Sequence, residues 1–90
     1  MYELQLTDTA VKHLKRFNQA EQQMIAKKLL YLAENFDLLK EGKKVTELKG
    51  TGYQHYRFVI ARRIRAIFEV KEDKLLLLVL KIGRRKDIYT

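Results

Sequence analysis

The chain has 90 residues, is 47% hydrophobic and 33% charged, and carries a formal net charge of +8. This length predicts one domain, residues 1–90, whose core buries about 60–65% of the unfolded surface. The absence of cysteine excludes disulfides and thiolate metal sites and agrees with a reducing cytoplasm. The longest apolar run, 75–80, is too short to span a bilayer, and residues 1–4 do not begin a signal peptide. We therefore expect a cytoplasmic protein with no membrane partner.

The positive charge is concentrated in the C-terminal half of the chain. Residues 53–90 hold ten Lys and Arg against four Asp and Glu, which is +6 of the total +8, and six of the seven arginines lie there. Clustering of this kind favours an anionic partner over an evenly solvated basic surface. RNA, DNA and an acidic protein segment all stay open at this point, because charge alone does not choose among them.

The N-terminal half predicts a strand followed by two helices. Residues 2–6 alternate apolar and polar side chains, as a half-buried strand does. Residues 7–9 offer N-caps for a first helix, and Asn18 with Glu21 forms a capping box for a second helix that ends near Asp37. We expect an antiparallel helix hairpin packed on the core through two apolar stripes. The stripes comprise Ala10, Val11, Leu14 and Phe17 in the first helix and Met24, Ile25, Leu29, Leu32, Ala33 and Phe36 in the second.

The C-terminal half predicts strands. A polar connection at 38–44 leads to a short extended piece at 45–48 and a glycine-containing turn at 49–52. Residues 53–60 and 64–70 then alternate, each with one apolar face, as strands with one buried side do. The apolar faces comprise Tyr56, Phe58, Ile60, Ile64, Ala66, Phe68 and Val70; the opposite faces comprise His55, Arg57, Val59, Arg63, Arg65, Ile67 and Glu69.

The last strand completes the predicted sheet. A polar hairpin loop at 71–74 precedes residues 75–82, which are apolar on both faces and predict a central strand covered on both sides. The element order is β-α-α-β-β-β. The predicted fold class is α+β, a two-helix hairpin packed on one face of a mainly antiparallel twisted sheet.

The sheet face opposite the helices is the candidate functional site. Arg57 and Arg65 are expected to project onto it from neighbouring strands, and residues 83–86 add cations at its rim. Two guanidinium groups near one phosphate would stabilise the transition state of phosphodiester cleavage. The alternative for both arginines is an ion pair with Glu69 or a plain solvated position.

Few side chains in this sequence are suited to acid–base chemistry. His55 is expected on the same face as Arg57 and is a candidate general acid or base, although an ordinary surface role is the simpler reading. His13, in the first helix, is expected to be exposed to solvent. The chain has no serine and no histidine pair at metal-ligand spacing, so we expect neither metal nor cofactor. An enzyme of this composition would act on a substrate that carries its own nucleophile, as RNA does with its 2′-OH.

Six short segments follow one another in a particular order and spacing: 48–52 (LKGTG), Tyr56-Arg57, 65–70 (RAIFEV), the acidic hairpin loop at 71–74, the aliphatic run 75–80, and 82–89 (IGRRKDIY). Together they resemble the RelE/ParE superfamily of bacterial and archaeal toxins over nearly the whole chain. The resemblance implies a toxin paired with an antitoxin. For the RelE branch it further implies metal-free cleavage of mRNA in the ribosomal A site, in which the 2′-OH attacks the adjacent phosphate and leaves a 2′,3′-cyclic phosphate.

The resemblance also implies roles for individual residues. By position in these motifs, Arg65 stabilises the transition state, Arg85 is the second functional arginine, Tyr89 stacks on a substrate base, and Arg57 contacts RNA or acts as the base. The chain departs from the family at Arg84, where histidine is frequent, so the general base is left between Lys81, His55 and the ribosome. The further residues expected to contact RNA are His55, Arg62, Arg63, Lys81, Arg84 and Lys86.

Two other functions fit the same resemblance. ParE toxins share the fold but inhibit DNA gyrase without nuclease activity, and a toxin-like domain that has lost activity would serve only as a binding partner. The cluster of Arg57, Arg65, Arg85 and Tyr89 favours work on RNA. The expected partners are the ribosome with mRNA and a cognate antitoxin in a toxin–antitoxin hetero-oligomer. The antitoxin would cover the cationic face or displace the C-terminal segment.

Overall fold

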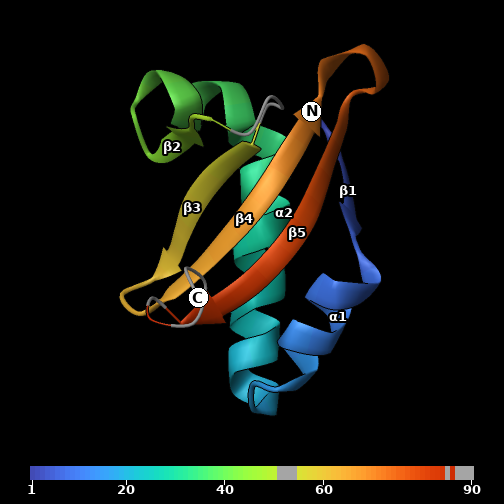
Figure 1. The fold of residues 1–90 in the computed structure, drawn as a ribbon, viewed down its shortest axis with the longest axis vertical. Coiled ribbons are helices and arrows are strands. Elements are labelled where there is room, and N and C mark those ends of the chain that lie inside the picture. Colours follow the sequence, from blue (N-terminus) through green and yellow to red (C-terminus); the bar gives the residue numbers. More distant parts are fainter. Residues whose placement is uncertain (51–54, 85, 87–90) are drawn as a thin grey trace.

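The structure, a computed structural model, describes residues 1–50, 55–84 and 86. Within these residues, two helices are packed on a five-stranded sheet of order β1-β5-β4-β3-β2 (Figure 1). Strands β1 and β5 pair in parallel, and the other neighbouring strands are antiparallel. The α+β class and the order of elements are as predicted. The elements are β1 (Glu3–Leu6), α1 (Asp8–Lys15), α2 (Gln19–Glu41), β2 (Val45–Leu48), β3 (His55–Ala61), β4 (Ile64–Lys71), the 3-10 turn η1 (Glu72–Lys74) and β5 (Leu76–Arg84).

Both helices begin at the predicted caps. The Thr7 hydroxyl accepts the backbone N–H of Ala10 at 3.1 Å, which satisfies one of the unpaired donors in the first turn of α1. At the start of α2, the Asn18 side chain accepts the Glu21 N–H at 2.8 Å, and the Glu21 carboxylate accepts the Asn18 N–H at 3.2 Å. This reciprocal pair is the capping box that the sequence indicates.

The predicted end of the second helix was wrong. Residues 38–41 extend α2 to Glu41 instead of forming a polar connection. The extra turn is held by Leu39, which is buried, and by Lys40, whose ammonium group lies 5.5 Å from the Tyr56 ring centroid. A hydrogen bond from Lys40 to the Tyr56 side chain raises the pKa of Lys40. The backbone is non-helical at Asn35 (φ −124°, ψ 22°), where α2 is kinked, and the part beyond the kink reaches Glu41 because tertiary contacts outweigh the polar composition of the segment.

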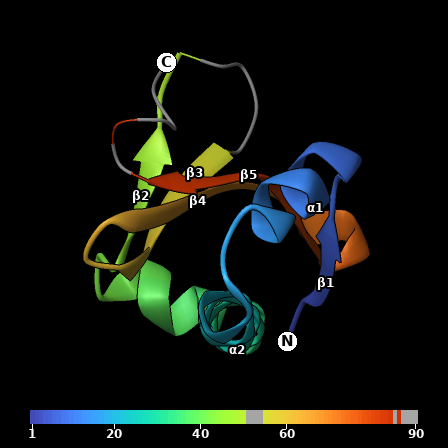
Figure 2. The same cartoon turned by 90° about the horizontal axis from the view of Figure 1, so that it is seen from below.

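The core lies between α2 and the sheet, as the view from below shows (Figure 2). Phe36 of α2 packs edge-on against three aromatic rings, those of Tyr2, Tyr56 and Phe68, at centroid distances of 5.2–5.8 Å. The alternation predicted for β3 and β4 is confirmed, since every second residue from Tyr56 to Ile60 and from Ile64 to Val70 is buried. These apolar faces explain why α2 packs where it does.

Strand β5 differs from its prediction in three ways, one of which is that it ends at Arg84 and not at Ile82. Leu75 adopts a left-handed backbone conformation (φ 48°) at the end of η1, so the strand begins one residue later, at Leu76. Its inner face is buried at Leu77 and Val79, whereas Leu76, Leu78 and Leu80 are only half-buried. The strand is central, between β1 and β4, but it is not fully covered on both sides.

A β-bulge interrupts the pairing of β4 with β5. Ile67 pairs with Lys81, and the next residue of β4, Phe68, pairs with Val79, which leaves Leu80 as the extra residue of β5. A bulge shifts the side-chain alternation by one position. Val79 before the bulge and Ile82 after it are both buried, and Lys81 is therefore exposed on the opposite face. The bulge is what lets a lysine stand between two core-facing residues.

Candidate functional site: a cationic sheet face

The strand register brings three cations to one face of the sheet. Arg57 of β3 is paired with Ile67 of β4, and Ile67 is paired with Lys81 of β5, so these residues form a row across three strands. Arg65 is paired with Val59 and Gly83, one step along the same face. Arg65 is thus a diagonal neighbour of both Arg57 and Lys81, and diagonal neighbours lie about 7–8 Å apart. We call Arg57, Arg65 and Lys81 the cationic face.

The two arginines are half-buried, and each guanidinium group makes one local hydrogen bond. Arg57 donates from Nη2 to the Thr46 hydroxyl of β2 at 3.4 Å. Arg65 donates from Nη1 to the Arg62 carbonyl at 3.3 Å, which folds it back toward the β3–β4 turn. Its partner across the β5 pairing is Gly83, which has no side chain to crowd the guanidinium. Such anchoring reduces the entropy lost when an arginine binds phosphate.

The other predicted RNA contacts occupy different places. Arg62 and Arg63 are exposed on the turn between β3 and β4, and Lys86 is exposed beyond β5. His55 lies on the same face as Arg57 but at the far end of β3, where its Nε2 is 3.8 Å from the Glu69 carboxylate. Glu69, considered above as a partner for arginine, therefore faces a histidine. Arg85 and Tyr89 lie outside the described residues, so their predicted roles stay predictions.

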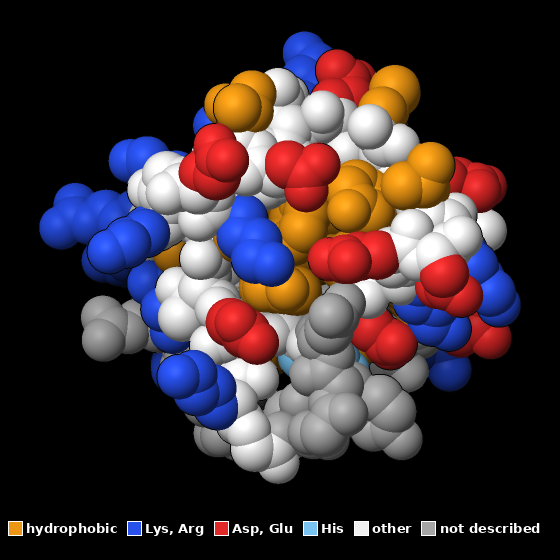
Figure 3. All heavy atoms as spheres, turned by 90° about the horizontal axis from the view of Figure 1, so that it is seen from above, with side chains coloured by type: hydrophobic (Ala, Val, Ile, Leu, Met, Phe, Trp, Pro, Cys, Tyr) orange, Lys and Arg blue, Asp and Glu red, His pale blue; other side chains and the backbone are white. Residues whose placement is uncertain are grey.

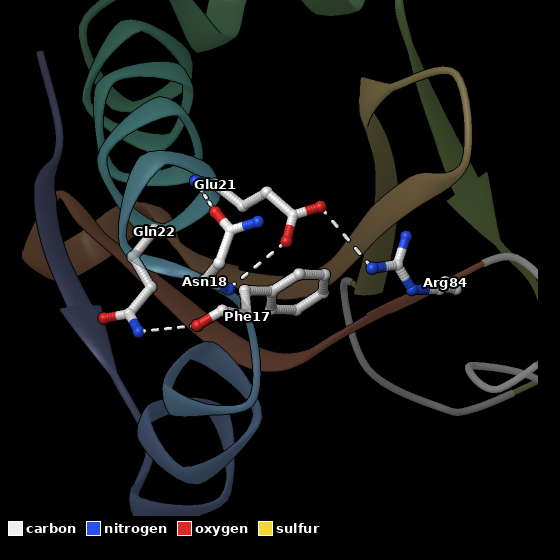
Figure 4. Close-up of polar contacts among 5 residues, drawn as sticks. All are labelled: Phe17, Asn18, Glu21, Gln22 and Arg84. Atoms are coloured by element: carbon white, nitrogen blue, oxygen red, sulfur yellow. Dashed lines mark hydrogen bonds and ion pairs between the residues drawn. The ribbon is translucent and has the colours of Figure 1, made fainter.

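Arg84 is held against the helices (Figure 4). Its guanidinium lies 5.3 Å from the Phe17 ring centroid, and its Nη2 lies 3.4 Å from Oε2 of Glu21. The same Glu21 completes the capping box of α2, so one carboxylate serves the helix start and the end of β5. An RNA contact by Arg84 would have to compete with this exposed pair, which is worth about 1 kcal/mol or less.

One residue of this region was misjudged from the sequence. His13 was expected to be exposed, but it is half-buried, and its Nδ1 accepts the backbone N–H of Ile82 at 3.2 Å. Burial, together with the cations Arg16 and Lys81, lowers the pKa of His13. The sequence did carry a signal, because His13 lies three residues after Ala10 and four before Phe17, both of which are buried. That spacing places it on the inner stripe of α1.

The charge of the molecule is not uniform. At the end marked N in Figure 1, Asp and Glu side chains surround an apolar area, and Lys and Arg side chains gather mainly along one side of that view (Figure 3). Within residues 1–50, 55–84 and 86, no three His, Cys, Asp or Glu side chains are grouped closely enough to bind a metal. In the same part of the chain no helix has the length and apolar character needed to cross a membrane.

The arrangement suits anion recognition more than general acid–base chemistry. Two guanidinium groups and an ammonium around Ile67 offer planar and point-like donors to phosphate oxygens. The only histidine on this face is beside a carboxylate, at the opposite end of β3 from Arg65. The chemistry that these residues support is therefore charge stabilisation of a bound anion such as a phosphate group.

The fold defined above is shared with solved RelE toxins. TM-scores are 0.72 for the RelBE toxin–antitoxin complex of E. coli, 0.76 for the RelBE2 complex of Mycobacterium tuberculosis and 0.72 for the archaeal RelE–RelB complex of Pyrococcus horikoshii. Sequence identities are 20%, 12% and 23%; the matches cover 93%, 93% and 96% of this chain and 96%, 98% and 97% of those chains. At these identities the likeness establishes the fold.

The family follows from a second comparison. Residues 4–89 match the family model described as the ParE toxin of the type II toxin–antitoxin system parDE. The chain belongs to this family and hence to the RelE/ParE superfamily, so it is a toxin of a type II toxin–antitoxin system. A search of curated proteins found no significant match.

Proposed function

We propose that this toxin is a ribosome-dependent endoribonuclease that cleaves mRNA without a metal ion. The observation that carries the proposal is the strand register, which puts Arg57, Arg65 and Lys81 around Ile67 on the open sheet face. Three cations at this spacing match the charge that develops on a phosphodiester during cleavage. Arginine is the better residue for this task because its planar fork binds two phosphate oxygens at once.

In the proposed reaction the RNA supplies the nucleophile. The 2′-oxygen attacks the adjacent phosphorus as its proton leaves, the bond to the 5′-oxygen breaks, and that oxygen takes up a proton. The products are a 2′,3′-cyclic phosphate and a 5′-hydroxyl end. Arg65 stabilises the added negative charge, Arg57 and Arg85 hold the phosphate, and Tyr89 stacks on a base. Lys81 or His55 would take the first proton, unless the ribosome does so.

Positioning on the ribosome accounts for a site with so few acid–base groups. Holding the 2′-OH in line with the scissile bond supplies much of the barrier reduction in reactions of this kind. The proposed division of labour is that the ribosome presents the mRNA in the A site and the toxin stabilises the transition state. The working compartment would then be the cytoplasm, where translation takes place.

The proposed protein partner is a cognate antitoxin. The E. coli, M. tuberculosis and P. horikoshii structures are all complexes of a toxin with its antitoxin. The net charge of +8 and the cationic face favour an antitoxin segment that is acidic and covers Arg57, Arg65 and Lys81. Such a segment would block RNA and neutralise the toxin in a hetero-oligomer.

The test is a reconstituted translation reaction with primer extension on the mRNA. The wild-type protein is expected to produce ends within A-site codons, and Arg65→Ala to reduce the cleavage rate by at least a hundredfold. Arg65→Lys keeps the charge but loses the bidentate geometry, and we expect an intermediate loss. Lys28→Ala removes an exposed cation from α2 and is the matched control, with cleavage unchanged. Intact mRNA with the wild-type protein would refute the proposal.

Inhibition of DNA gyrase is the second candidate, and the match to the ParE family model is the observation that favours it. In that case the cationic face would bind a protein surface and perform no chemistry. Supercoiling assays with purified gyrase separate the two functions, because only a ParE-like toxin would stop supercoiling while mRNA stays intact. A protein that does neither, yet binds its antitoxin, would be a toxin-like domain without activity.

A further inference from the structure

One edge of the end of β5 is paired with β4, and the other edge is held by α1 and by the start of α2 in place of a strand. β1 ends at Leu6, opposite Val79, so residues 80–84 of β5 continue past it. Along that edge the Thr7 hydroxyl donates to the Leu80 carbonyl at 3.2 Å, and His13 Nδ1 accepts the Ile82 N–H at 3.2 Å. The Arg84–Glu21 pair follows at 3.4 Å. We call these three contacts the β5 seam.

The seam begins at the bulge that directs Lys81 to the cationic face. Leu80 is the bulged residue, and its carbonyl is the first group bound by the seam. Ile82, two residues on, directs its side chain into the core and its N–H toward His13. Lys81 lies between these two anchored residues. Its direction therefore depends on two supports, the pairing of Lys81 with Ile67 of β4 and the hold of the seam on both neighbours.

The central contact of the seam requires a neutral imidazole. Nδ1 can accept the Ile82 N–H only when it carries no proton, which puts the ring proton of the neutral form on Nε2. If Nδ1 carried a proton, two N–H donors, those of His13 and Ile82, would point at each other. The N–H of Ile82, a buried residue, would then have lost its acceptor. An amide that loses its acceptor in this way destabilises the local structure.

The charges around His13 act in the same direction. Arg16 on its own helix and Lys81 on β5 both oppose a third positive charge, and burial adds to their effect, so the pKa of His13 lies below its usual value. Arg84 also faces α1 from β5, but Glu21 neutralises it. Thr7, the remaining member of the seam, does not titrate. Opening of the seam therefore takes up a proton when the pH falls below about 6.5, the value of a free histidine.

We propose that His13 is a positioning residue: its neutral imidazole fixes the end of β5 and with it Lys81, and its protonation releases both. Above pH 6.5 the seam is fully formed. As the pH falls from 6.5 toward the lowered pKa of the folded state, the open form gains population, by at most about tenfold per pH unit. Protonation of His13 would thus lower the activity of the toxin on acidification. The weakening of the toxin on acidification is the one part of this inference that rests on the proposed function, because it depends on the role given there to Lys81.

Amide hydrogen exchange on the full chain tests the proposal between pH 5.5 and 7.5. The Ile82 exchange rate, corrected for intrinsic exchange and compared with that of Phe68 in β4, reports opening of the seam. In the wild type we expect relative opening of Ile82 to increase severalfold from pH 7.5 to 5.5. His13→Asn is the matched variant, because its Oδ1 can accept the same N–H and does not titrate. In His13→Asn the relative exchange rate of Ile82 should not change with pH. In His13→Ala the seam should be open at every pH, so Ile82 should exchange fast throughout.

The outcomes that overturn the proposal are specific. If wild type and His13→Asn share one pH profile, or if Ile82 in His13→Ala exchanges as slowly as in the wild type, His13 does not control the strand. Translation inhibition at pH 7.5 and 6.2, expressed relative to His13→Asn, adds a functional measurement. Seam opening without any change in RNA cleavage would leave the positioning role intact and count against the part given to Lys81 in the proposed function.

Discussion

The two faces of the sheet are built from the same strands but are determined by different physics. On the inner face, Tyr56 of β3 and Phe68 of β4 stack at 5.5 Å and pack against α2, so burial and shape decide which residues fit. On the outer face, Arg57, Arg65 and Lys81 stand around Ile67, and their placement depends on register and on one bulge. The inner face therefore sets stability, whereas the outer face is available for binding.

The largest loss of stability is expected for a substitution on the inner face. Phe36→Ala removes a ring that contacts Tyr2, Tyr56 and Phe68, and truncation of a buried phenylalanine lowers the free energy of unfolding by about 3–5 kcal/mol. Urea unfolding followed by circular dichroism measures the loss. Tyr31→Ala, on the half-exposed outer side of α2, serves as control and should change stability far less. A loss below 1 kcal/mol for Phe36→Ala would contradict the core described above.

A smaller effect is expected at Arg84, which lies at the end of β5 on the helix side of the sheet. Arg84→Met keeps an apolar stem against Phe17 but removes the pair with Glu21 and the cation–π contact, so we expect a loss of about 1 kcal/mol. Glu21→Gln should show how much of this comes from the ion pair, because the amide oxygen can still cap α2. Equal stability of wild type and Arg84→Met in low salt would mean that the contact contributes nothing.

The smallest stability change, within about 0.5 kcal/mol, is expected for Lys81→Ala on the outer face. Its effect should instead be seen in binding to a single-stranded RNA with 2′-O-methyl groups, which cannot cleave itself. If Lys81 contacts one phosphate, the slope of log K against log salt should fall by about 0.7. Lys28→Ala, on α2, is expected to leave the slope unchanged. A Lys81→Ala variant that unfolds more easily but binds RNA as before would reverse the roles assigned to the two faces.

Periodicity was sufficient to predict most of the inner face. The alternation from Tyr56 to Val70 identifies the buried residues of β3 and β4, because each strand has one apolar side. The Asn18–Glu21 box likewise identified the start of α2, since capping depends on residues close in sequence. The pairing of Arg57 and Arg65 with neighbouring positions on one face follows from the same alternation.

The features that were missed depend on contacts far apart in sequence. The bulge at Leu80 was hidden because residues 75–80 are uniformly apolar and do not show where the alternation shifts. His13 and Ile82 are 69 residues apart, and Arg84 and Glu21 are 63 apart, so nothing local indicates either contact. The end of α2 was misplaced because Lys40 reads as a solvent-facing residue until the Tyr56 ring lies beneath it.

The parallel pairing of β1 with β5 has a consequence for how the toxin is made. β1 is synthesised first, yet its neighbour in the sheet is the last strand to leave the ribosome. Until then β2, β3 and β4 can pair, but β1 lacks its neighbouring strand, and contacts this distant form slowly. The row of Arg57, Ile67 and Lys81 therefore cannot be complete in a nascent chain before β5 has left the ribosome.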